Sequence, residues 1–147
     1  MSSFTVRVAD WKIDNPAVRS IRETVFIQEQ NIPVELEWDQ FDENCLHLLA
    51  LDNTNKPIGT ARLLQDGHIG RMAVLKEWRG CGVGAALLKH LLREAKMRGL
   101  AIAIVNAQTY AVNFYMRFGF QSEGNEFLDA GIPHVRMILQ LVGEQAD

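Results

Sequence analysis

The stretch Arg79-Gly80-Cys81-Gly82-Val83-Gly84 lies near the middle of the chain, between a strand-like run at residues 68–74 and an amphipathic pattern that continues to about residue 98. Glycine lets the backbone approach a ligand closely and adopt conformations that other residues avoid. A helix start presents unpaired amide N–H groups and the positive end of the helix dipole, and both favour phosphate. Arg79 adds a positive charge whose planar geometry suits phosphate oxygens. Residues 79–84, called the glycine turn below, therefore predict a pyrophosphate-binding site.

The residues around this turn argue against two familiar phosphate-binding patterns. A nucleotide-hydrolysing P-loop continues with lysine and then serine or threonine, but Gly84 is followed by Ala85 and Ala86. A dinucleotide site needs glycines spaced G-x-G-x-x-G and an acidic residue about 20 positions on. Here the turn has G-x-G-x-G, and residues 104–106 are Ile-Val-Asn. An enzyme that uses ATP or NAD is therefore disfavoured, and a glycine-rich turn without a ligand is the structural alternative.

The composition is that of an ordinary globular protein. The 147 residues are 48% hydrophobic and 22% charged, which is enough for one domain, residues 1–147, with a substantial core. The net charge of −3 argues against nucleic acid as the main partner. The sequence has no apolar run near the ~20 residues that span a membrane, and residues 1–7 do not form a secretory signal. Cys45 and Cys81 are too few for a disulfide framework and lie in no metal-binding motif, so we expect a cytoplasmic protein without a metal site.

The alternation of apolar and polar residues predicts an α/β fold with a mixed, mostly antiparallel sheet of six or seven strands flanked by helices. The expected strands are residues 4–8, 46–51, 58–64, 68–74, 101–107, 121–128 and 134–141. Asn15 followed by Pro16 predicts the start of a helix that reaches about residue 28. A long helix should follow the glycine turn, and a short one should cover residues 112–117. Because residues 101–107 are almost wholly apolar, we expect them to form a buried strand parallel to residues 68–74.

The pattern Arg-x-x-Gly-x-Gly, from Arg79 to Gly84, resembles the coenzyme A signature of the GNAT superfamily of acetyl-CoA-dependent acyltransferases. Three features match that superfamily in the right order. The first is the strand at residues 69–74 followed by the glycine turn. The second is residues 111–120 (Ala-Val-Asn-Phe-Tyr-Met-Arg-Phe-Gly-Phe), which look like its second cofactor motif, and the third is the antiparallel front half with an early helix. Residues 25–30 and 131–134 resemble, more narrowly, the bacterial ElaA-like branch, most of whose members have no defined substrate. The resemblance covers most of the chain and implies a GNAT-like fold.

The resemblance implies an acetyl-CoA site made of the strand backbone, the glycine turn and one side chain of the short helix. These residues are Met72, Ala73, Val74, Arg79, Gly80, Cys81, Gly82, Val83, Gly84 and Asn113. The strand at residues 101–107 would splay away from residues 68–74 and leave a gap for the acyl thioester. By resemblance Tyr115 protonates the departing thiolate, and a role as a core residue is the alternative. The Val74 amide would stabilise the oxyanion of the tetrahedral intermediate.

Three residues are candidates for the base that removes a proton from the acceptor amine. His68 falls near the position of a glutamate in some family members, but a turn histidine after Asp66 is the alternative. Glu29 ends the first helix, in a region that the family uses for the acceptor, and a solvated glutamate is the alternative. His134 precedes the last expected strand and is equally compatible with a turn and a site residue.

The connector between residues 29 and 44 is rich in carboxylates, and Pro33 predicts that it is irregular or briefly helical. Its acidic residues are Glu35, Glu37, Asp39, Asp42 and Glu43. Such a run is usually solvated, and the alternative is that it attracts a cationic acceptor. His47 follows in an apolar strand, where we expect a structural role.

By this resemblance the chain transfers an acetyl group from acetyl-CoA to a primary amine of a small molecule or peptide. Direct attack in a ternary complex needs no covalent enzyme intermediate, because the positioning of the two reactants supplies much of the rate. A binding module that senses acetyl-CoA with little turnover is the alternative. An exposed strand edge could pair two copies into a homodimer.

Overall fold

A single seven-stranded sheet forms the centre of the computed structural model, which describes residues 3–141. The strand order is β1-β2-β3-β4-β5-β7-β6, and every neighbouring pair is antiparallel except β4 and β5. The strands are β1 (Phe4–Val8), β2 (Leu46–Asp52), β3 (Pro57–Leu63), β4 (His68–Val74), β5 (Ile102–Gln108), β6 (Gln121–Asp129) and β7 (Ile132–Gln140). The predicted mixed, mostly antiparallel sheet flanked by helices is therefore confirmed.

The helices lie between these strands. They are α1 (Trp11–Arg22), which continues as the π-helix η1 (Glu23–Glu29), then α2 (Val34–Glu37), α3 (Val83–Met97) and α4 (Val112–Met116). Single 3₁₀ turns occur at η2 (Asp42–Asn44), η3 (Lys76–Trp78) and η4 (Thr109–Ala111). The connector after η1 is briefly helical, as expected.

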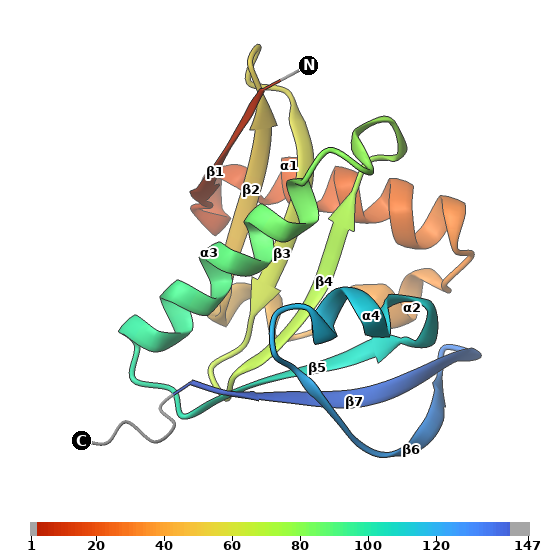
Figure 1. Ribbon diagram of the computed structural model, residues 1–147. Coiled ribbons are helices and arrows are strands. Elements are labelled where there is room, and N and C mark those ends of the chain that lie inside the picture. The colour runs from red at the N-terminus through yellow and green to blue at the C-terminus, as the bar shows by residue number, and fades with distance from the viewer. Residues whose placement is uncertain (1–2, 142–147) are drawn as a thin grey trace.

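The sheet separates two layers of helices, with α3 on one face and α1 on the other (Figure 1). Alternation along β2 builds both layers, because successive side chains of a strand point to opposite faces. Leu48 and Ala50 pack with Leu87 of α3, whereas Leu49 packs with Val18 of α1. The larger core lies on the α3 face, where α4 also packs through Phe114 and Tyr115.

The predicted helix start at Asn15-Pro16 is wrong. The α1 helix begins five residues earlier, at Trp11, because Asp10 caps it with a side-chain oxygen 3.1 Å from the Lys12 amide. The carboxylate of Asp14 accepts a hydrogen bond from the Asp10 amide in return. Pro16 lies inside the helix. The N-cap pair at positions 10 and 14 therefore outweighs the Asn-Pro signal.

Candidate active site

The parallel strands β4 and β5 pair over two positions only. His68 lies opposite Ile104 and Ile69 opposite Val105, and no further pairs follow along the rest of these strands as the structure describes them. From Gly70 onward the two strands diverge. The predicted splay next to Met72, Ala73 and Val74 is present, and it leaves an opening within the sheet.

A β-bulge in β4 marks the place where the strands separate. Thr60 pairs with Ala73 while Arg62 pairs with Gly70, so β4 carries one residue more than β3 over this interval. Arg71 in the bulge has φ of 48°, a left-handed conformation that non-glycine residues rarely adopt. Such strain persists where the surroundings impose it, and it concentrates at functional sites. The bulge therefore singles out the residue just before the predicted cofactor strand segment.

The glycine turn leads into α3 as predicted. Gly80 and Gly82 have φ of 79° and 88°, and Gly82 is the N-cap of α3. A Cβ atom built on either glycine has no heavy atom within 4 Å, so the space above both is open. Gly82 has no side chain to cap the first amides of the helix. The turn thus offers backbone donors and open space together.

The short helix α4 stands beside the start of α3. A Cβ atom on Gly84 would lie 3.8 Å from the Phe114 ring, so the two helix ends nearly touch. Asn113 is exposed on α4, and Tyr115 is half-buried with its ring against Phe114 and Phe120. Burial raises the pKa of Tyr115 to about 12, with a smaller contribution from Tyr110. The phenol is therefore protonated at neutral pH and is able to donate a proton.

A pocket of about 670 Å³ passes through the opening between β4 and β5. Its wall includes Phe26 and Ile32 from the α1 face, together with Phe114 and Tyr115 from the α3 face. The predicted cofactor residues that line it are Met72, Ala73, Val74 and Arg79. The other predicted cofactor residues, Gly80 to Gly84 and Asn113, stand outside the described wall of this pocket. The pocket therefore reaches both faces of the sheet.

The three candidate bases have different surroundings. His68 lines the pocket, and its Nδ1 lies 2.9 Å from a carboxylate oxygen of Asp66. His134 also lines the pocket but is a buried residue inside β7, not a residue before the last strand; its Nδ1 lies 2.6 Å from the Ile132 carbonyl oxygen. Glu29 is absent from the described wall and forms an ion pair of 2.6 Å with Arg79. The structure thus brings two of the three candidates to the pocket.

Residues 20–141 match the family model of an acetyltransferase (GNAT) domain. The chain belongs to the GNAT acetyltransferase family. An uncharacterized N-acetyltransferase of Bacillus subtilis, YjcF, is 43% identical over 123 residues, which cover 80% of this chain and 86% of that protein. The crystal structure of Escherichia coli ElaA matches with a TM-score of 0.81 and 26% identity, over 91% of this chain and 98% of that one. A GNAT acetyltransferase from Elizabethkingia anophelis with acetyl-CoA bound shares the fold, with a TM-score of 0.70 and 19% identity over 94% and 98% of the two chains.

A buried ionic network of this GNAT domain was not predicted. Arg22 is fully buried on α1, and its Nε and Nη1 donate to Glu37 at 2.7 Å and to Asp42 at 2.8 Å. Arg62 on β3 bonds Asp42 at 2.9 Å. The interpretation of the connector as solvated is therefore wrong for Glu37 and Asp42, each of which is 2% exposed. In the sequence, this network shows only as Arg22 within an otherwise apolar helical stripe. Its carboxylate partners cannot be recognised, because they lie far along the chain.

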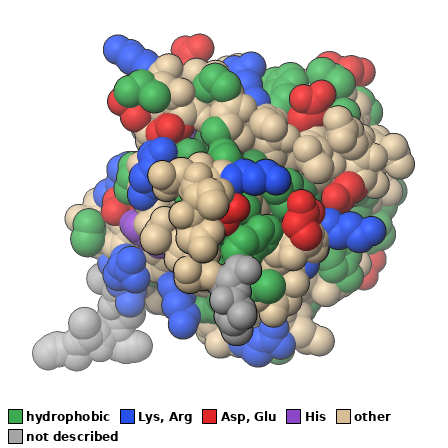
Figure 2. All heavy atoms as spheres, turned by 90° about the horizontal axis from the view of Figure 1, so that it is seen from above, with side chains coloured by type: hydrophobic (Ala, Val, Ile, Leu, Met, Phe, Trp, Pro, Cys, Tyr) green, Lys and Arg blue, Asp and Glu red, His purple; other side chains and the backbone are tan. Residues whose placement is uncertain are grey.

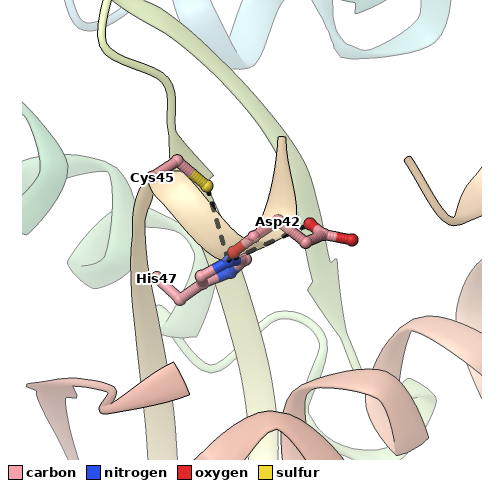
Figure 3. Close-up of side chains that lie close together, drawn as sticks. All are labelled: Asp42, Cys45 and His47. Carbon is pink, nitrogen blue, oxygen red and sulfur yellow. Dashed lines mark hydrogen bonds and ion pairs between the residues drawn. The ribbon is translucent and has the colours of Figure 1, made fainter. Parts of the chain in front are cut away.

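Asp42, Cys45 and His47 gather at the edge of this network, with ligand atoms within 4.8 Å of one another (Figure 3). The sequence predicts no metal-binding motif around Cys45. His47 Nε2 lies 2.8 Å from the Asp42 carbonyl oxygen, so that nitrogen carries the proton. Burial raises the pKa of Cys45 to about 11 and lowers that of His47, so a neutral thiol and a neutral imidazole result.

Two arginines already occupy Asp42 Oδ1, and their charge disfavours a cation. The trio is accordingly part of the polar core, and the structural role expected of His47 fits its stacking on Trp11.

The pKa directions of the network carboxylates differ. Burial acts to raise the pKa of Asp42, but hydrogen bonds and charges from Arg22 and Arg62 outweigh it, so the pKa is lowered. For Glu37 burial prevails over the charges of Arg71, Arg22 and Arg62, so its pKa is raised. Glu37 and Asp42 thus both pair with Arg22, but their pKa values are shifted in opposite directions.

Acidic and basic side chains are interspersed on the face of the molecule seen in Figure 2. Among the described residues of this GNAT domain, no helix combines the length and apolarity that crossing a membrane requires.

Proposed function

We propose that this GNAT domain is an acetyl-CoA-dependent N-acetyltransferase whose acceptor is a primary amine of a small molecule or peptide. The observation that carries the proposal is the opening between β4 and β5, which lies directly before the glycine turn at the start of α3. The acetyl-CoA held by the fold neighbour from Elizabethkingia anophelis supports the same cofactor.

In this proposal the backbone of Met72, Ala73 and Val74 binds the pantetheine arm, since β5 no longer pairs with this part of β4. The amides of the glycine turn bind the pyrophosphate, and Arg79 lies at the pocket wall to add its charge. Asn113 on the exposed side of α4 contacts the coenzyme arm. These contacts would hold the acetyl thioester in the opening of the sheet.

The amine attacks the thioester carbonyl directly, and the oxyanion is stabilised by the Val74 amide. Tyr115 protonates the departing thiolate, since the phenol carries its proton at neutral pH. His68 and His134 stand on the pocket wall as candidate proton acceptors. Glu29 instead orients Arg79, because its carboxylate is paired with that guanidinium.

Calorimetric titration with acetyl-CoA tests the proposal, with Gly82→Trp as the variant. The indole should fill the open space above the turn, so binding is expected for the wild type alone. Release of free thiol with a panel of primary amines then tests turnover. Binding without thiol release for any amine would favour an acetyl-CoA sensor, and no binding by either protein would reject the cofactor.

A further inference from the structure

Glu37 is the buried carboxylate that the ionic network presents to the pocket. It ends the short helix α2 and is 2% exposed, yet it belongs to the pocket wall. Asp39 and Asp42, the other carboxylates of the network, are not part of the described wall. A carboxylate in this position is costly unless it is well bonded, and it is available to a ligand in the pocket.

Two arginines from different elements hold Glu37 in place. Arg22 on α1 donates from Nε to Oε2 at 2.7 Å and from Nη2 to the Glu37 carbonyl oxygen at 3.0 Å. Arg71 in the β4 bulge donates to the same carbonyl oxygen at 3.0 Å and lies 3.3 Å from Oε2. Both side chains thus fix the backbone and the carboxylate together, which is the rigid support that a functional group needs.

The contacts of both arginines with the Glu37 carboxylate are to Oε2, and the side-chain hydrogen bond from Arg22 also ends on that oxygen. Three side-chain atoms among the described residues are buried without a hydrogen bond, and Oε1 is not one of them. Since Glu37 lines the pocket and Oε1 is not among the sealed, unpartnered atoms, Oε1 is the carboxylate oxygen that a ligand in the pocket would meet.

The charges around Glu37 are balanced within the network, so its arginines do not repel a cation from the pocket in excess of their carboxylate partners. Arg22, Arg62 and Arg71 are matched within the network by three carboxylates: Glu37, Asp39 and Asp42. Asp39 and Asp42 occupy Arg62, and Asp39 also pairs with Arg71 at 3.1 Å. These arginines are therefore engaged. Arg62 and Arg71 share the pocket wall with Glu37, and His68 on β4 is a further titratable group of that wall.

We propose that Glu37 receives the ammonium group of the acceptor and takes a proton from it, an inference that rests on the proposed function. An N–H bond of the ammonium breaks, the proton moves to Oε1 of Glu37, and the nitrogen keeps the electron pair. That pair forms the N–C bond to the acetyl carbonyl, and the C–S bond breaks to release the thiolate. Tyr115 gives its proton to the thiolate and regains one from the nitrogen of the new amide, while Glu37 returns its proton to solvent.

The substitution Glu37→Gln tests this role, because it keeps the shape and removes the charge. Glu35→Gln is the matched control, since Glu35 is an exposed residue of the same helix outside the pocket wall. Two probe amines separate proton removal from packing: benzylamine is an ammonium ion at neutral pH, and p-anisidine is uncharged. Glu37→Gln should lower kcat/KM for benzylamine about 100-fold or more, the size of a general-base effect. The loss for p-anisidine should be much smaller, and the loss for benzylamine should shrink as the pH rises.

Equal losses with both amines, or no loss with either, would overturn the role of Glu37. A loss confined to benzylamine in His68→Gln, with Glu37→Gln unaffected, would also overturn it and assign the proton to His68. A second measurement needs no turnover: benzylammonium, added to the complex with coenzyme A, should shift the ¹³C resonance of the Glu37 carboxyl group. No shift contradicts the proposal. Acetyl-CoA affinity is measured for every variant, so that loss of the cofactor site is distinguished from loss of the proton acceptor.

Discussion

Arg79 and Glu29, 50 residues apart in the chain, form an ion pair with Nη2 of the arginine 2.6 Å from Oε1 of the glutamate. Nε of Arg79 also donates to the Val74 carbonyl oxygen at 2.9 Å. One guanidinium thus joins the end of the π-helix η1, the end of β4 and the glycine turn. The residue expected to bind pyrophosphate is held in position before any ligand arrives.

Replacing Arg79 by alanine should weaken acetyl-CoA binding about tenfold or more, as expected for the loss of a hydrogen bond to a charged group. Glu29→Gln keeps an oxygen acceptor, and the pair is partly exposed, so affinity and stability should change by at most about 1 kcal/mol. Calorimetry measures the acetyl-CoA affinity, and thermal unfolding measures the stability. A large loss of turnover in Glu29→Gln with unchanged cofactor affinity would instead support Glu29 as a base.

Gly82→Ala should weaken acetyl-CoA binding, because the left-handed φ of 88° is strained in alanine and the first amides of α3 shift. Gly99 beyond the other end of α3 is the matched control, with φ of 77° and equally open space around it. Each substitution should cost about 1–2 kcal/mol of stability. Only Gly82→Ala should change the affinity; similar losses in both variants would mean that the turn has no special contact with the cofactor.

Tyr115→Phe should lower kcat about 100-fold, a typical loss for a general acid, while acetyl-CoA affinity stays near that of the wild type. Since the pKa of Tyr115 is about 12, its deprotonation should not limit the rate below pH 10. A rate profile from pH 6 to 10 checks this. Wild-type turnover in Tyr115→Phe would leave the ring with its packing role alone.

Asp42→Ala should destabilise the fold by about 3–5 kcal/mol, because it leaves buried Arg22 and Arg62 without a shared partner. Glu43→Ala, an exposed neighbour, is the control. The lowered pKa of Asp42 means that its stabilisation is present above its ordinary pKa of 3.8 and is lost as the pH falls through the folded-state value. Glu37 acts oppositely: its contribution is full below 4.5 and declines as the pH rises through its raised pKa. Chemical denaturation from pH 3 to 7 should therefore show the gap between Asp42→Ala and wild type closing at acid pH.

The two cysteines should react very differently with a thiol reagent at neutral pH. Cys81 is exposed in the glycine turn, whereas Cys45 is half-buried with a pKa raised to about 11. Labelling followed by mass spectrometry should modify Cys81 first, since the thiolate is the reactive form. Acetyl-CoA should slow this reaction by covering the turn. Unchanged labelling of Cys81 at saturating acetyl-CoA would place the cofactor elsewhere.

Local signals explain which parts of this fold could be predicted from the sequence. The bounds of β4 are those expected, because Asp66-Gly67 and the glycine turn punctuate that strand on both sides. The helix start was wrong where two local signals competed, and the π-helix η1 leaves no mark in the apolar periodicity. The predicted roles of Tyr115, the glycine turn and the candidate bases remain predictions.

The ionic network could not be predicted, because it joins residues whose pairing only the tertiary fold decides. Arg22 meets Glu37 and Asp42 across 15 and 20 residues, and Arg71 meets the Glu37 carbonyl across 34. A run of carboxylates has the same sequence pattern whether its side chains are buried in ion pairs with arginines or exposed to water. The bulge at Arg71 could not be predicted either, because the sequence of β4 alone does not show that it carries one residue more than β3.

The opening between β4 and β5 has a kinetic consequence, because it is reached from both faces of the sheet. In the proposed function, a donor held at the start of α3 and an acceptor arriving beside α2 would approach from opposite sides and would not share a route. Neither substrate has to leave before the other arrives, so double-reciprocal plots should intersect instead of running parallel. A site that is open on both faces of the sheet lets both substrates bind together, so no covalent acetyl-enzyme intermediate is required.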